Sequence, residues 1–296
     1  METLHALDDL WDFSDPEGTE GRFRAAIEGS DDESYRAEAL TQVARTQGLR
    51  SMFEDAHDTL DLVAGVLPRV APRVETRYLL ERGRVWNSSG TPQKARELFL
   101  HAFDGARRLS DDYLTIDAAH MVAIVEAPSQ ALEWNLLGFR ILEESRQDRA
   151  KQWTGALSNN IAWTYHDTGD HETALSYFEK GLAHRAEAGK EPALRIARWA
   201  VARCKRSLGR MQEALDEQLA IQAQYFPTFD PVGEELGHSS YDGYLAEEVA
   251  ECLLALGRAE ESKPYFRAAH ALLANDGRLA KSESARIERL SKLANS

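Results

Sequence analysis

The sequence has 296 residues, of which 43% are hydrophobic and 28% are charged, and its formal net charge is −14. This composition is typical of a folded soluble chain, and the acidic balance argues against nucleic-acid binding. Because the N-terminus lacks the basic and apolar regions of a signal peptide, and no apolar run approaches the ~20 residues of a membrane helix, we expect a cytoplasmic protein that does not bind membranes.

The first 33 residues are acidic, with two arginines as their only basic residues. Residues 3–13 place leucine and aromatic side chains on one helical stripe, which predicts a short amphipathic helix. Asp15 followed by Pro16 is typical of a helix start, since Asp caps the N-terminus and Pro tolerates the first helical position. We assign residues 1–33 to acidic N-terminal helices packed on the main domain.

Pairs of helices separated by a turn recur along most of the remaining chain. Apolar residues are spaced three to four apart, and most first helices end at a glycine, which permits a positive φ. The predicted helices are 34–46 with 52–66, 74–87 with 92–108, 113–125 with 129–145, two within 155–188, 193–208 with 211–225, and 244–256 with 259–274. The predicted turn residues are Gly48, Gly90, Ala127-Pro128, Gly169, Gly209 and Gly257.

Two further segments complete the chain. Residues 227–243 hold two prolines and three glycines without helical periodicity, which predicts a long surface loop. Residues 279–294 are predicted to form a last helix, and its charged outer face suits a cap at the end of a repeat array.

The stretch 155–188 shows the repeat pattern most clearly. Small residues at Ala162, Ala174 and Gly181 would let two helix backbones approach closely, while Tyr165 and Phe178 would fill the space between them. The apolar face of the pair consists of Leu157, Ile161, Ala162, Tyr165, Ala174, Leu175, Phe178, Gly181 and Leu182.

This stretch resembles a tetratricopeptide repeat of the kinesin-light-chain-like and bacterial regulatory kind. The matching residues are Ile161, Ala162, Tyr165, Gly169, Ala174, Phe178 and Gly181. The resemblance implies an all-α fold, a right-handed superhelix (α-solenoid) of about six helix pairs, with about fourteen to sixteen helices in all. It assigns residues 34–274 to the repeat domain and residues 275–296 to a C-terminal capping helix.

The resemblance also implies a concave groove, which the first helix of each pair lines. The expected groove residues are Glu81, Arg84, Asn87, Asp117, His120, Asn159, Asn160, Trp163, His166, Trp199, Arg203, Tyr244, Glu247, Glu248 and Glu251. Asn can both donate to and accept from a peptide backbone, and Trp offers flat apolar area. We expect Asn160 to contact the partner's backbone, the Trp residues its apolar side chains, and the acidic end a basic residue.

These residues favour a non-enzymatic scaffold that binds a peptide or protein partner in the groove without a cofactor. The alternative is a regulator whose groove is filled by its own acidic N-terminal arm, or by a small molecule or peptide, until a signal displaces it. The sequence leaves open the identity of the partner and whether the chain forms a homodimer.

Patterns for catalysis or metal binding are weak. Asp117 and His120, three residues apart on one helix, could carry acid–base chemistry together with Glu81. Four residues of metal-binding types cross a helix end, so their side chains diverge; they are His166, Asp167, Asp170 and His171. Since none of these sets follows a known motif, we expect no catalytic site and no metal site.

We expect the basic residues of one helix and the two cysteines to have structural roles. Five basic residues cluster on one predicted helix and are expected to balance acidic neighbouring segments; they are Arg195, Arg198, Arg203, Lys205 and Arg206. Cys204 and Cys252 each lie five residues before a turn glycine. They are predicted to be reduced, buried fillers of the helix interface.

Overall fold

The structure is a computed structural model that describes residues 7–189, 191–232 and 242–295. Within these ranges the regular elements are helices and there is no strand, which confirms the all-α prediction. The chain divides into two compact units, residues 1–157 and 158–296, and the boundary falls inside α9 (Thr154–Asp167). None of the helices in the described ranges has the length and apolar character that a membrane span requires.

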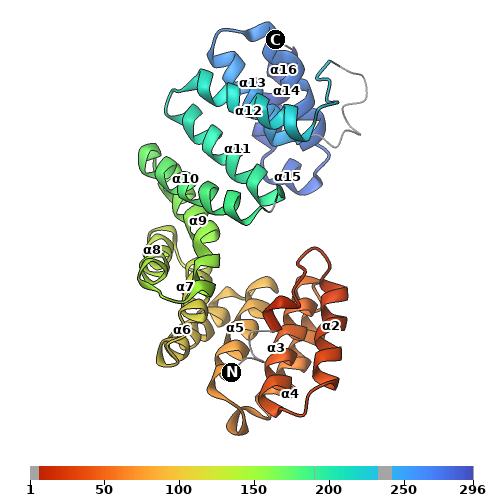
Figure 1. Cartoon of the computed structure of the whole chain (residues 1–296). Coiled ribbons are helices and arrows are strands. Elements are labelled where there is room, and N and C mark those ends of the chain that lie inside the picture. The colour runs from red at the N-terminus through yellow and green to blue at the C-terminus, as the bar shows by residue number, and fades with distance from the viewer. Residues whose placement is uncertain (1–6, 190, 233–241, 296) are drawn as a thin grey trace. The chain divides into compact units, whose positions relative to one another are not determined.

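The first unit consists of successive helix pairs that follow α2 (Pro16–Glu28) (Figure 1). The pairs are α3 (Glu33–Leu49) with α4 (Phe53–Ala64), α5 (Pro72–Ser88) with α6 (Pro92–Arg108), and α7 (Asp112–Val125) with α8 (Pro128–Glu144). Two short 3-10 helices, η1 (Leu67–Arg69) and η2 (Asp148–Trp153), lie in the connections. The core runs from pair to pair, since Leu80, Phe99 and Leu114 from three consecutive helices share one buried cluster.

The second unit continues the same arrangement. Its helices after α9 are α10 (His171–Ala188), α11 (Glu191–Ser207), α12 (Met211–Tyr225), α13 (Gly243–Ala255), α14 (Ala259–Leu273), α15 (Gly277–Ser282) and α16 (Ser284–Asn295). Buried Ala162, Ala174 and Phe178 pack together with Val201 of α11, as the small-and-large pattern predicts. Tyr165 packs against this cluster as predicted, although it is only half-buried, and its ring also stacks on Tyr177 at a centroid distance of 6.0 Å.

Most of the predicted turns are confirmed by the backbone. Gly90, Gly169, Gly209 and Gly257 all have positive φ, between 77° and 87°, directly after the first helix of a pair. Gly48 is a wrong prediction, because α3 continues to Leu49 and Ser51 adopts the left-handed backbone instead, with φ of 61°. The amide of Met52 donates to the carbonyl of Gln47 at 2.9 Å and so closes this turn, with its left-handed residue three positions later than predicted.

The structure corrects parts of the predictions for the N-terminal helix, the 227–243 loop and the last helix. Residues 3–6 of the predicted 3–13 helix and residues 233–241 of the predicted 227–243 loop lie outside the described residues. The 3–13 helix is also shorter than predicted, because residues 11–13 are not helical. Gly243 begins α13 and is buried, so the loop ends earlier than expected. The predicted single helix 279–294 is divided into α15 and α16, and Leu290 and Ala294 of α16 pack in a buried cluster with Phe266 of α14.

Both cysteines are free and fully buried, as predicted. Burial raises the pKa of the Cys204 thiol to about 11 and that of the Cys252 thiol to about 12, so almost no reactive thiolate forms near neutral pH. We therefore expect a thiol reagent to label the native protein at least about a hundredfold more slowly than the urea-unfolded chain. Rapid labelling of both thiols in the native state would contradict the helix faces assigned to α11 and α13.

Candidate functional site

A line of aromatic rings crosses the first helices of the pairs in the second unit. Trp163 lies on α9, Trp199 on α11 and Tyr244 on α13. The ring centroids of Trp163 and Trp199 are 6.1 Å apart, and those of Trp199 and Tyr244 are 6.3 Å apart. The guanidinium of Arg203 lies 5.7 Å from the Trp163 ring and 5.6 Å from the Trp199 ring, at cation–π distance from both. Four of the predicted groove residues of this unit therefore lie next to one another: Trp163, Trp199, Arg203 and Tyr244.

An apolar pocket of about 320 Å³ opens beside this line of rings. Buried Ile221 and Leu245 contribute apolar lining, together with the half-buried ring of Trp199. Ile196 and Tyr244 also line the pocket, and they are exposed to solvent by 51% and 39%. The polar lining comes from Arg195 and Asp242, whose Nη1 and Oδ2 atoms form an ion pair at 3.5 Å. Such a pocket suits one large apolar side chain with polar groups near it.

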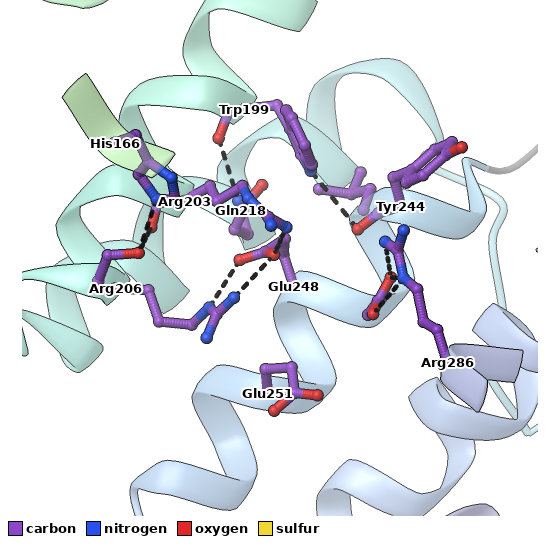
Figure 2. A network of polar contacts seen from close by, with 12 residues as sticks. His166, Trp199, Arg203, Arg206, Gln218, Tyr244, Glu248, Glu251 and Arg286 are labelled. Atoms are coloured by element: carbon purple, nitrogen blue, oxygen red, sulfur yellow. Dashed lines mark hydrogen bonds and ion pairs between the residues drawn. The ribbon is translucent and has the colours of Figure 1, made fainter. Parts of the chain in front are cut away.

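The acidic residues predicted at the far end of the groove are not free to meet a partner. Figure 2 shows Glu248 held by two arginines of α11: Arg203 donates to it at 2.6 Å and Arg206 donates through two nitrogens at 2.7 and 3.0 Å. Glu247 accepts from Arg286 at 2.9 Å, and Glu251 pairs with Arg289. The expectation of an open acidic surface is therefore wrong, because arginines of neighbouring helices neutralise each carboxylate.

The basic cluster on α11 balances acidic neighbours, as predicted. Besides the two arginines on Glu248, Arg195 pairs with Asp242 and Lys205 pairs with Glu217. Burial opposes the charge on Arg206, but its hydrogen bonds to Glu248 and the attraction of that carboxylate raise the pKa of the guanidinium overall. The ion pairs thus tie α11 to α12 and to the start and middle of α13.

Asn159, Asn160 and His166 lie on α9 and are all half-buried. His166 Nε2 is 2.9 Å from the Ser207 hydroxyl, and its ring centroid is 4.8 Å from that of His171. Burial, followed by the charges of His171 and Arg203, lowers the pKa of His166, so the imidazole is neutral at pH 7. Trp163 lies one helical turn from Asn160, and its ring packs edge-on against Phe178 at a centroid distance of 4.9 Å, so it also supports the core.

The predicted groove residues of the first unit form a buried charge network instead of an open lining. Glu81 and Asp117 are fully buried, and Arg84 joins them by donating to Glu81 at 2.6 Å and pairing with Asp117. Arg45 of α3 lies 3.7 Å from Glu81. Burial works against ionisation of Asp117, but Arg84 and Arg45 lower the pKa of this carboxyl below its usual value. The prediction that Glu81 and Asp117 line an open groove is therefore wrong, because facing helices bring opposite charges into contact.

Asn87 and His120 are half-buried, and His120 lies near Asp117 and Arg84 of this network. Burial, more than the nearby charges, lowers the pKa of His120. Its ring centroid is 5.3 Å from that of Trp153. The geometry thus keeps His120 neutral near the carboxylate of Asp117, while that carboxylate is held by Arg84.

A comparison with known protein families identifies the repeats. Residues 153–218 match the tetratricopeptide repeat family. Within this range the chain carries tetratricopeptide repeats. The match covers the whole of the predicted best pair and most of the pair that follows, and it includes Asn160, Trp163, Trp199 and Arg203. No curated protein matches the sequence.

Solved structures with a similar fold align with nearly the whole chain. The apo form of RapI aligns with a TM-score of 0.70 at 12% identity and covers 100% of this chain and 82% of that one. The apo form of the quorum sensor NprR from B. thuringiensis aligns with a TM-score of 0.63 at 16% identity, covering 99% and 78%. NprR in complex with its cognate peptide NprX aligns with a TM-score of 0.56 at 17% identity, covering 99% and 81%. At these identities the comparison establishes the fold.

Several residues of the pocket were missed by sequence reasoning. Arg195 and Ile196 lie four and three residues before Trp199, so helical spacing alone could have placed them on the same face. Asp242 could have been noticed as the cap of α13, since its carboxylate accepts from the Tyr244 amide at 2.9 Å. Ile221 could not have been found in this way, because it comes from the second helix of a pair.

Proposed function

We propose that this protein is a non-enzymatic scaffold that binds a peptide or protein segment on the aromatic surface of its second unit. The supporting observation is the pocket lined by Trp199 and Tyr244, where the apolar side chain of Ile196 and the ring of Tyr244 stay exposed. Exposed apolar area next to a pocket is typical of a binding surface. Aromatic anchors in such a place carry a large share of binding energy in protein interfaces.

The structural comparisons support a peptide as the partner. NprR has been solved with its cognate peptide NprX, and a Rap protein that aligns with a TM-score of 0.54 has been solved with the Competence and Sporulation Factor. Both share the fold of this chain. We infer that this chain also binds a peptide, and we propose that an extended segment lies on its repeats.

The charges near the pocket favour an apolar anchor over a basic one. Glu247, Glu248 and Glu251 are each engaged by arginines, so they do not offer a free carboxylate to a partner. A basic residue would have to compete with Arg203 and Arg206 for Glu248. We therefore propose that a large apolar side chain enters the pocket, and that Asn160 contacts the backbone of the same segment one repeat away.

To test the proposal, peptides are selected from a random display library by their binding to the immobilised full chain. Ile196 is 51% exposed at the pocket, so Ile196→Glu adds a charge there without removing a buried side chain. We expect this change to weaken binding of the selected peptides roughly 30-fold, as for loss of a contact worth about 2 kcal/mol. Fluorescence anisotropy of a labelled peptide measures the effect.

The matched control is Ile124→Glu, because Ile124 on α7 is 48% exposed and lies outside the pocket. It should leave the affinity unchanged. Equal binding by the wild type and by Ile196→Glu, with both proteins folded, would place recognition elsewhere on the chain.

A further inference from the structure

The N-terminal segment, defined here as residues 7–13, packs against the first helices of its own unit. Leu7 is 1% exposed and joins a buried cluster with Phe23 of α2 and Val43 of α3. The indole of Trp11 donates to Gln42 of α3 at 3.0 Å. The contacts combine an apolar anchor with specific hydrogen bonds, as in a bound peptide.

Asp8 of the N-terminal segment forms ion pairs with two arginines that lie far apart in the sequence. Arg77 of α5 donates from Nη2 to Oδ1 of Asp8 at 2.8 Å. Arg149 of η2 pairs with the other carboxylate oxygen, Oδ2. One carboxylate thus bridges two guanidinium groups, each through a separate oxygen.

The two arginines need this carboxylate. Arg77 is fully buried, and besides Asp8 it reaches Glu38 from Nε at 3.3 Å, while Glu38 also accepts from Arg73 at 3.1 Å. Burial opposes the charge on Arg77, but the carboxylates of Asp8 and Glu38 raise the pKa of its guanidinium above the usual value. In the described part of the chain, Asp8 is the one carboxylate that forms an ion pair with Arg149.

Each arginine also has a contact that does not involve Asp8, namely Glu38 for Arg77 and Tyr113 for Arg149. The guanidinium of Arg149 lies 3.9 Å from the ring of Tyr113 on α7, at cation–π distance. The Asp8 side chain keeps 20% of its surface exposed, whereas the Arg77 side chain keeps 2%. The Asp8 carboxylate therefore lies nearer to solvent than the buried Arg77 that binds it.

We propose that Arg77 and Arg149 form a binding site for the carboxylate of an acidic, aromatic peptide, and that the N-terminal segment occupies this site as a built-in competitor. The sequence of that segment, LDDLWDF, describes the ligand class: an acidic residue one position after an apolar anchor, with an aromatic residue three positions further on. An external peptide of this kind replaces Asp8 at the arginines and frees the segment. This site goes beyond the proposed function, because its residues are all in the first unit.

The probe is a fluorescent synthetic peptide with the sequence LDDLWDFSD, which corresponds to residues 7–15. It is titrated into the full chain carrying Asp8→Asn, which weakens the resident segment while keeping its shape. We expect this variant to bind the peptide at least tenfold more tightly than the wild type. Adding Arg149→Ala should weaken binding at least tenfold again, and so should replacing the first Asp of the peptide by Asn.

Asp9→Asn is the matched control, because Asp9 is an exposed neighbour of the same charge. It should bind the peptide as weakly as the wild type. No binding by folded Asp8→Asn, or equal binding by the Asp8 and Asp9 variants, would overturn the proposal. Loss of binding on adding Ile196→Glu to Asp8→Asn would place the peptide in the pocket of the second unit and would also overturn it.

A second measurement on the wild type covers the case in which Asp8→Asn fails to fold. Amide hydrogen exchange is followed at residues 7–15 with and without a large excess of the peptide. We expect exchange of these amides to become faster when the peptide displaces the segment, with α5 remaining protected. Unchanged exchange at saturating peptide would show that the segment is a fixed part of the fold and would overturn the proposal.

Discussion

Glu248→Gln is expected to destabilise the second unit by about 3 kcal/mol. Glu248 is 1% exposed, and its carboxylate is the shared partner of Arg203 and Arg206. Removing one member of a buried ion pair typically costs about 3–5 kcal/mol, because an uncompensated charge remains. We expect the lower end of that range, since the two arginine side chains keep about a quarter of their surface exposed and water can screen them.

Urea denaturation measures the loss of stability, and amide hydrogen exchange locates it. Exchange should become faster in α11 and α13, while α5 keeps its protection. Glu261→Gln serves as the control, because Glu261 forms a comparable pair with Arg258 at 2.6 Å but on an exposed surface. It should leave the stability nearly unchanged, because water screens an exposed ion pair. Equal effects of the two changes would mean that Glu248 is solvated, contrary to the structure.

Phe99→Ala is expected to destabilise the first unit by about 3–5 kcal/mol, the usual range for removing a fully buried Phe. Phe99 of α6 is 0% exposed and packs in the cluster that joins α5, α6 and α7. Loss of its ring would leave a cavity between these three helices. The same urea measurement applies, with Leu62→Ala as the control, because Leu62 is 66% exposed.

A double-mutant cycle tests the packing partner of Phe99. Gly83 on α5 lies so close to the Phe99 ring that a methyl group at this position would overlap it. Gly83→Ala alone should therefore cost about 1–3 kcal/mol, although Ala is the better helix former. In the Phe99→Ala background the methyl group has room, so the same change should cost nothing or should stabilise the helix. Strict additivity of the two changes would contradict this close approach of α5 and α6.

The local elements were predictable because their causes are local. Gly169 and Asp170 end one helix and begin the next through the backbone conformation and the side-chain cap that these residue types favour. The spacing of Ala162, Ala174 and Phe178 indicated which faces would be buried. The turn predicted at Gly48 was wrong because Ser51 also adopts a left-handed backbone when neighbouring hydrogen bonds hold it. Residue type alone does not reveal this.

The charges at the groove could not be assigned in the same way. Glu248 and Arg203 are 45 residues apart, and Arg84 and Asp117 are 33 apart, so their pairing depends on how successive helices face each other. In the sequence an acidic residue on a first helix has the same pattern whether solvent or an arginine faces it. The prediction of a basic partner followed from this ambiguity.

By itself, the sequence determined the all-helical class, the repeat of helix pairs, most turns and caps, and the burial of both cysteines. All of these follow from spacing along one helix or from the preferences of one turn. Only the tertiary structure decided which groove residues are exposed, where the pocket beside Trp199 opens, and that Asp8 reaches Arg77 and Arg149. The physical reason is that each of these depends on side chains from helices far apart in sequence, whose contacts arise only when the helices pack.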